Sequence, residues 1–138
     1  MDKQTRKVSV RFCKDNYVTI NQVAEADFYP SSQRGYQFAG FYKQIREIVL
    51  KYEEQFTKMV RNMGEPNKEG IKEIPKSKQE DFEIALEAIL KEEEEITFIP
   101  MNFQNCKKIS LTPKQMAALM DFFSEDYIKF LETAPEKE

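Results

Sequence analysis

Residues 36–63 constrain the fold of this chain more than any other stretch. Their apolar side chains recur at intervals of three and four positions, which is the spacing of one face of an α-helix. These positions are Phe38, Phe41, Tyr42, Ile45, Ile48, Val49, Tyr52, Phe56, Met59, Val60 and Met63. A helix over this stretch would be about 40 Å long at 1.5 Å per residue. An apolar stripe of that length must be covered by other parts of the chain or by a second molecule.

The region that follows predicts a reversal of the chain and a second helix. Residues 64–76 contain two Gly and two Pro, which interrupt helices, and Gly64 stands where a left-handed residue often ends a helix. Residues 78–94 again place their apolar side chains on one face. We therefore expect residues 36–63 and 78–94 to form an antiparallel helical hairpin joined by the connector.

A third helix is predicted over residues 113–132. Its start has the pattern of a capping box, with Thr112 as the N-cap, Pro113 as the first helical residue and Gln115 three positions after the cap. Residues 124–126 are expected to interrupt the helix before a last apolar run. This start is the most specific local signal in the chain.

Short runs of β-forming residues predict a small sheet. Residues 8–12 alternate between apolar and polar, and residues 17–20 are rich in β-formers, so a β-hairpin is predicted over residues 7–20. A further strand is predicted over residues 96–103. It contains Pro100, which cannot donate a ladder hydrogen bond, so we expect it at an edge, where it could pair with the hairpin.

Together these elements predict an α+β fold that is mainly helical. It consists of an antiparallel helical hairpin plus a third helix, with a small antiparallel sheet of two or three strands. A chain of 138 residues is long enough for one domain with its own core, which we expect to span residues 1–133. Residues 134–138 are expected to be a frayed tail.

The composition argues against an enzyme. The chain has no histidine, which is the usual general base and metal ligand near neutral pH. Its four glycines form no phosphate-binding loop, and two isolated cysteines, Cys13 and Cys106, cannot make a zinc site and are expected to be free thiols. We expect no catalytic residue, no cofactor, no metal ion and no small-molecule substrate.

The charge is distributed unevenly. Residues 1–63 carry 11 Lys and Arg against 7 Asp and Glu, a net charge of +4, whereas residues 64–138 carry 10 against 17, a net charge of −7. This asymmetry suits two halves that pack against each other, head-to-tail self-association, or the docking of a basic partner. The overall net charge of −3 argues against a nucleic-acid partner. No apolar run approaches the ~20 residues of a membrane span and no signal peptide is evident, so we expect a cytoplasmic protein.

The order of these features resembles a small, functionally uncharacterised family of proteins encoded by tailed phages and prophages. The likeness covers roughly residues 41–123. Residues 82–96 have the form F-E-x-A-L-x-x-I-L-x-E-E-E-E-I, and residues 111–122 have the form L-T-P-x-Q-M-x-x-L-M-x-F. The resemblance implies a phage-encoded accessory, virion-associated or assembly protein, and it carries over no catalytic residues.

We therefore expect a non-enzymatic protein that acts through contact with a protein partner or with itself, in the host cytoplasm or incorporated in a virion. The alternative is a phage-borne inhibitor of a host defence or transcription protein that uses the acidic segment of residues 80–95 as its contact. Candidate partner-binding residues lie at the two ends of the long stripe and in the acidic run: Phe38, Phe41, Tyr42, Met59, Met63, Glu92, Glu93, Glu94 and Glu95.

Overall fold

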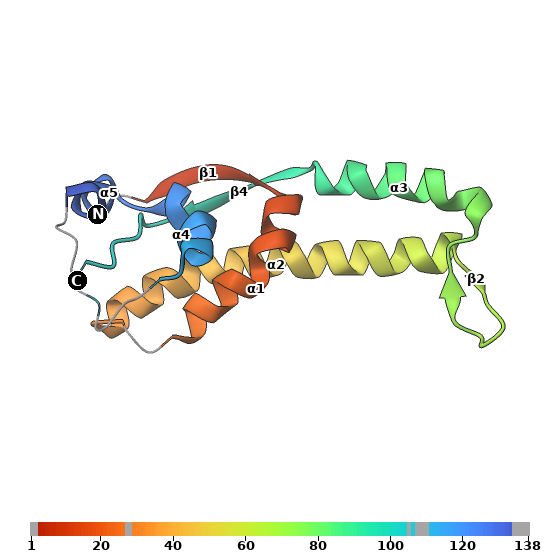
Figure 1. Cartoon of the computed structure of the whole chain (residues 1–138), viewed down its shortest axis with the longest axis horizontal. Helices are drawn as coiled ribbons and strands as arrows, with labels where there is room; N and C mark the ends of the chain where they lie inside the picture. The colour runs from red at the N-terminus through yellow and green to blue at the C-terminus, as the bar shows by residue number, and fades with distance from the viewer. Residues whose placement is uncertain (1–2, 27–28, 105, 107–110, 134–138) are drawn as a thin grey trace.

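One long helix forms the spine of the molecule. A computed structural model describes residues 3–26, 29–104, 106 and 111–133. In it, α2 (Ser32–Met63) is a single helix of 32 residues that runs most of the length of the structure (Figure 1). At one end the other elements surround α2, and we call this part the body. At the other end only α3 (Lys76–Leu90) and a short hairpin accompany it, and we call this part, residues 53–89, the arm.

The helix predicted over residues 36–63 is confirmed and begins four residues earlier. Ser31 is its N-cap, and the Ser31 hydroxyl accepts a hydrogen bond from the Arg34 amide at 3.2 Å. The helix ends before Gly64 as expected, but Gly64 is not left-handed, because its φ is −77°. Glycine is needed there for a close approach, since a Cβ atom would lie 2.4 Å from the Val60 carbonyl oxygen.

The predicted hairpin over residues 7–20 is wrong. β1 (Gln4–Ser9) is followed directly by α1 (Val10–Glu25), without a turn or a second strand. The Ser9 side chain caps this helix by accepting a hydrogen bond from the Phe12 amide at 3.0 Å. The buried residues of α1 recur at helical spacing and are Val10, Cys13, Thr19, Ile20 and Val23. Apart from Val18, which is exposed, the β-branched residues of this region therefore serve as the buried face of a helix that packs on α2.

The sheet is formed by segments from opposite ends of the chain. β1 pairs antiparallel with β4 (Glu93–Phe98), from Gln4 opposite Phe98 to Ser9 opposite Glu93. The strand predicted over residues 96–103 thus begins three residues earlier and ends before Pro100. Side chains alternate along β4, so that Ile96 is buried while Thr97 is exposed. This is the small antiparallel sheet that was predicted, with two strands.

The outer edge of β4 is closed by a side chain of α2. The Gln44 amide group donates to the Thr97 carbonyl oxygen at 2.6 Å, and the Gln44 side-chain oxygen accepts a hydrogen bond from the Thr97 amide at 2.8 Å. A neighbouring strand would make the same two bonds. One glutamine therefore takes the place of a third strand at this residue.

The arm is the predicted antiparallel helical hairpin with shifted bounds. The second helix, predicted over residues 78–94, begins at Lys76 and ends at Leu90. The connector forms a second small sheet at the tip, in which β2 (Glu65–Pro66) pairs antiparallel with β3 (Lys72–Glu73). Gly70 lies between these strands with a left-handed φ of 82°, which favours glycine.

The helix predicted over residues 113–132 is divided into three elements. They are α4 (Pro113–Leu119), the short 3₁₀ helix η1 (Met120–Phe122) and α5 (Glu125–Thr133). The capping box is confirmed, because the Gln115 amide donates to the Thr112 hydroxyl at 3.2 Å and the Thr112 amide donates to the Gln115 side chain at 3.0 Å. The interruption falls at residues 123–124 and overlaps the predicted 124–126 only at Ser124, because Glu125 and Asp126 begin α5. The predicted tail of residues 134–138 lies outside the described residues.

Both cysteines are free thiols, as predicted. Cys13 is completely buried in the body, and its burial, followed by the nearby Glu94 carboxylate, raises the pKa of the thiol to about 12. The unfolded chain releases the same proton near the ordinary pKa of 9. Burial of the neutral thiol therefore contributes its full stabilisation below pH 9, and this contribution is lost as the pH rises toward 12.

A comparison of wild type with Cys13→Ala measures this effect. Above pH 9 we expect the unfolding free energy of wild type to fall, relative to the variant, by about 1.4 kcal/mol for each pH unit. Urea denaturation followed by circular dichroism at about pH 8 and about pH 10.5 gives both free energies. A difference between the two proteins that stays constant over this range would contradict the assignment of Cys13 as a buried, protonated thiol.

Candidate protein contact surface

The first half of the long stripe is the core of the body. Phe41 is 1% exposed, and its ring centroid lies 4.7 Å from that of Phe122 and 6.3 Å from that of Phe98. Phe38 is buried as well and lies 6.4 Å from Phe103 between ring centroids. Burial contradicts the prediction that Phe38 and Phe41 bind a partner, because segments distant in sequence already cover both rings.

Tyr42 joins two helices of the body. It is half-buried, its hydroxyl donates to the Asn21 side-chain oxygen at 2.6 Å, and it lies 3.1 Å from the Tyr17 hydroxyl. The hydrogen bond with Tyr17, followed by burial, raises the pKa of Tyr42. Tyr42 therefore serves the contact between α1 and α2, and the predicted partner surface at this end of the stripe is not formed.

The second half of the stripe lies in the arm, where no residue is buried. Apolar side chains recur on the facing sides of α2 and α3, and we call them the arm seam: Phe56, Met59, Val60, Met63, Phe82, Ala85, Leu86 and Ile89. The rings of Phe56 and Phe82 meet edge to face with their centroids 5.8 Å apart, yet Phe56 remains 36% exposed. Met59 and Met63 belong to this accessible seam and remain candidate partner residues.

Further apolar side chains on the arm and at its base point to solvent. Ile84 of α3 is 62% exposed, and Leu50 of α2 is half-exposed. Both residues lie outside the apolar faces of their helices. Helical periodicity alone therefore did not identify them as exposed apolar positions. The incomplete burial of α3 could not be predicted either. An apolar face in a sequence does not show how many other helices or strands will pack on it.

The acidic run lies at the start of β4 and not at the end of a helix. Its members are Glu92, Glu93, Glu94 and Glu95. Strand alternation turns Glu94 to the opposite side from its neighbours, and its carboxylate pairs with the Lys51 ammonium at 3.5 Å. Glu95 lies opposite Lys7 of β1. These four side chains do not gather into one contact surface.

Ion pairs join the basic first half of the chain to the acidic second half. They are Arg6 with Asp121, Arg11 with Glu87, and Lys51 with Glu94. All three lie where solvent reaches them, so each contributes about 1 kcal/mol or less. The charge asymmetry is thus used, at least in part, where the two halves pack against each other.

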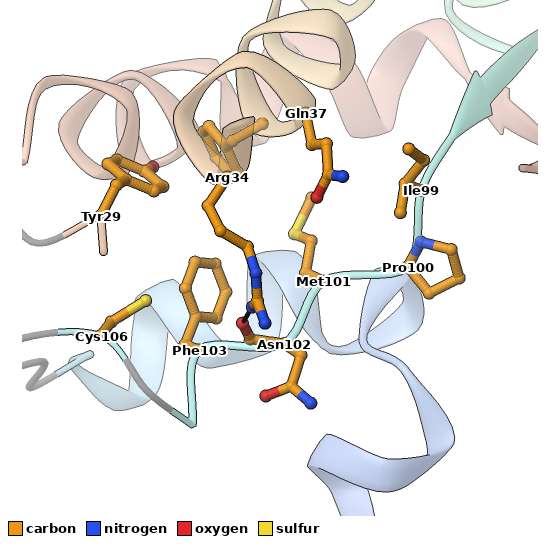
Figure 2. A pocket seen from close by; sticks show the side chains of 10 residues that line it. Tyr29, Arg34, Gln37, Ile99, Pro100, Met101, Asn102, Phe103 and Cys106 are labelled. Atoms are coloured by element: carbon orange, nitrogen blue, oxygen red, sulfur yellow. Dashed lines mark hydrogen bonds between the residues drawn. The ribbon is translucent and has the colours of Figure 1, made fainter. Parts of the chain in front are cut away.

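A shallow hollow of about 480 Å³ on the body is lined by residues that include Gln37, Gln44 and Thr97. Beside it, a small cavity lies between α2 and the segment after β4 (Figure 2). Its volume is about 30 Å³, which is room for a few water molecules at most. Arg34 reaches across this space and donates to the Asn102 carbonyl oxygen. Burial raises the pKa of the Tyr29 hydroxyl and of the Cys106 thiol, so both stay protonated near neutral pH. The cavity offers neither the space for a substrate nor an activated nucleophile.

The arm seam is therefore the strongest candidate for a functional surface. Among the described residues there is no group of three or more side chains that could hold a metal ion. No helix of that same part of the chain is both long and apolar enough to cross a membrane. Comparisons of the chain with protein-family models, curated proteins and solved structures found no match.

Proposed function

We propose that this chain is a non-enzymatic, phage-encoded protein that acts through protein–protein contact made by its arm. The arm seam is the observation that carries the proposal. It is a continuous set of apolar side chains, none of them buried, on two helices that project from the body. Two helices alone cannot bury a stripe of this width, and exposed apolar patches on soluble proteins are typical of interaction sites.

The role in a phage rests on the resemblance described above. The motifs of residues 82–96 and 111–122 resemble proteins of tailed phages and prophages, which favours a part in assembly or in the virion. The first motif begins within the arm, so the segment that carries the likeness includes one side of the seam. Such a protein acts in the host cytoplasm, or on the particle if it remains bound there.

Site-specific crosslinking tests the contact. A photoreactive amino acid at Met59 lies in the arm seam, whereas the same group at Val18, which is 68% exposed on α1, lies on the body. In infected cells we expect covalent protein adducts from position 59 and none from position 18. Adducts from both positions, or from neither, would remove the arm as the contact surface.

Deletion of the gene tests the assembly role separately. We expect a lower yield of complete particles and the protein itself, or its adducts, in purified particles or assembly intermediates. Particle yield that does not change after deletion would remove the assembly role, while the crosslinking result would still decide whether the arm makes a contact.

A further inference from the structure

We infer that the molecule covering the arm is a second copy of this chain, and that the two arms pack side by side as a four-helix bundle. This inference rests on the proposed function, because it names the partner of the same surface. A two-fold axis along the arms places α2 of each copy antiparallel to α3 of the other copy. The two helices of each arm then form a second layer that covers one face of the other arm.

One face of the arm carries small and flexible apolar side chains beside the polar Gln55 and Asn62. An α-helix turns by about 100° per residue, and because α2 and α3 run antiparallel, Met59, Ala85 and Ala88 lie on the same face. Met59 and Ala85 are half-buried and Ala88 is exposed. Small alanine side chains allow helices to approach closely, and a flexible methionine fills the remaining gaps.

Opposite charges lie at matching heights along the two edges of this face. The contact between Phe56 and Phe82 sets the register of the two helices, so Lys58, two residues further along α2, is nearly level with Asp81, one residue earlier in α3. Among the described residues, Asp81 forms no ion pair, and Lys58 pairs only with Glu54 on its own helix, at 3.8 Å. In the two-fold arrangement, Lys58 of each copy faces Asp81 of the other.

The exposed area of the chain is consistent with a missing subunit. The chain exposes 9877 Å², whereas a compact monomer of 16.3 kDa is expected to expose about 7,500 Å². This surplus exceeds the roughly 800 Å² that each partner buries in a stable complex. A second arm has the same length as the first and can cover the face with Met59, Ala85 and Ala88 from end to end, and symmetry satisfies both charge pairs at once.

Exchange of the two charges provides the test. Wild type is expected to be a dimer by light scattering and sedimentation equilibrium at concentrations on the order of 0.1 mM. Lys58→Glu and Asp81→Lys should each weaken self-association by about tenfold or more, because two repulsive pairs replace two attractive ones. Mixed in equal amounts, these two variants should form a mixed dimer, since the two introduced charges then face each other and the second pair keeps its native residues. Lys43→Glu makes the same charge change on α2 within the body and should leave the dimer unchanged.

Each outcome supports or overturns the inference. Monomeric wild type overturns it, and the crosslinking experiment then shows whether another protein occupies the arm or whether the proposed contact fails as well. A dimer that neither variant weakens places the interface elsewhere on the chain. Loss of association in both variants without recovery on mixing overturns the pairing of α2 with α3 across the two-fold axis.

Discussion

Phe41→Ala is expected to lower the free energy of unfolding by about 3–5 kcal/mol, which is a large part of the stability of an ordinary domain. The ring is 1% exposed and packs between Phe38, Phe98 and Phe122, so its removal leaves a cavity among side chains that cannot all move to fill it. Urea denaturation at a protein concentration low enough to keep the chain monomeric measures the change.

A matched control lies on the same helix. Tyr36 is 81% exposed, so Tyr36→Ala also removes an aromatic ring from α2 but should change the free energy of unfolding by about 0.5 kcal/mol or less. Equal effects of the two substitutions would contradict the burial of Phe41 in the core of the body. They would also return Phe41 to the set of candidate partner residues.

Amide hydrogen exchange is expected to divide the molecule at the same place. In the monomer, amides of α3 should exchange at least about 100-fold faster than those of residues 41–52 in α2, which corresponds to an opening free energy lower by about 2.7 kcal/mol. The reason is that the arm has no buried residue between Tyr52 and Leu90, so few apolar contacts are lost when it opens.

The concentration dependence supplies the control for this measurement. If two arms form a bundle, protection of α3 should rise with protein concentration, while the amides of residues 41–52 should be unaffected until the whole chain unfolds. Equal protection of α3 and of the body in dilute protein would show that the arm is not a weakly held element, and would contradict the expected order of opening.

The elements that could be predicted from the sequence are those whose signals lie within a few residues of one another. The capping box of Thr112 and Gln115 needs only its own four residues, and both of its hydrogen bonds are present. The long helix was evident because its apolar period continues for so many turns. The interruption at Ser124 was evident for a similar local reason.

The errors occurred where distant segments decide the local structure. Residues 10–20 contain β-branched residues that favour a strand, but the face they bury against α2 has the period of a helix, and Ser9 caps it. The acidic run continued the pattern of α3 in the sequence. In the structure, pairing with β1 draws Glu93 to Phe98 into a strand, because that pairing satisfies the backbone of both segments.

The candidate contact surface could be predicted only in part, again because distant segments decide which residues are covered. Helical periodicity identified one continuous stripe and the two ends at which it could be open. It could not show which end the rest of the chain covers, because that depends on where α1, β4 and η1 pack. They cover the end with Phe38 and Phe41, and the end with Met59 and Met63 stays accessible.

The hydrogen bonds between Gln44 and Thr97 have a consequence for aggregation. An open sheet edge is a template on which extended chains can add without limit, and such growth leads to fibres. At β4 the glutamine side chain already occupies the donor and the acceptor of Thr97, and the exposed charges of Glu93 and Glu95 follow along the strand. Addition of an extended chain to this edge of the sheet, and the growth of fibres from it, is thereby discouraged.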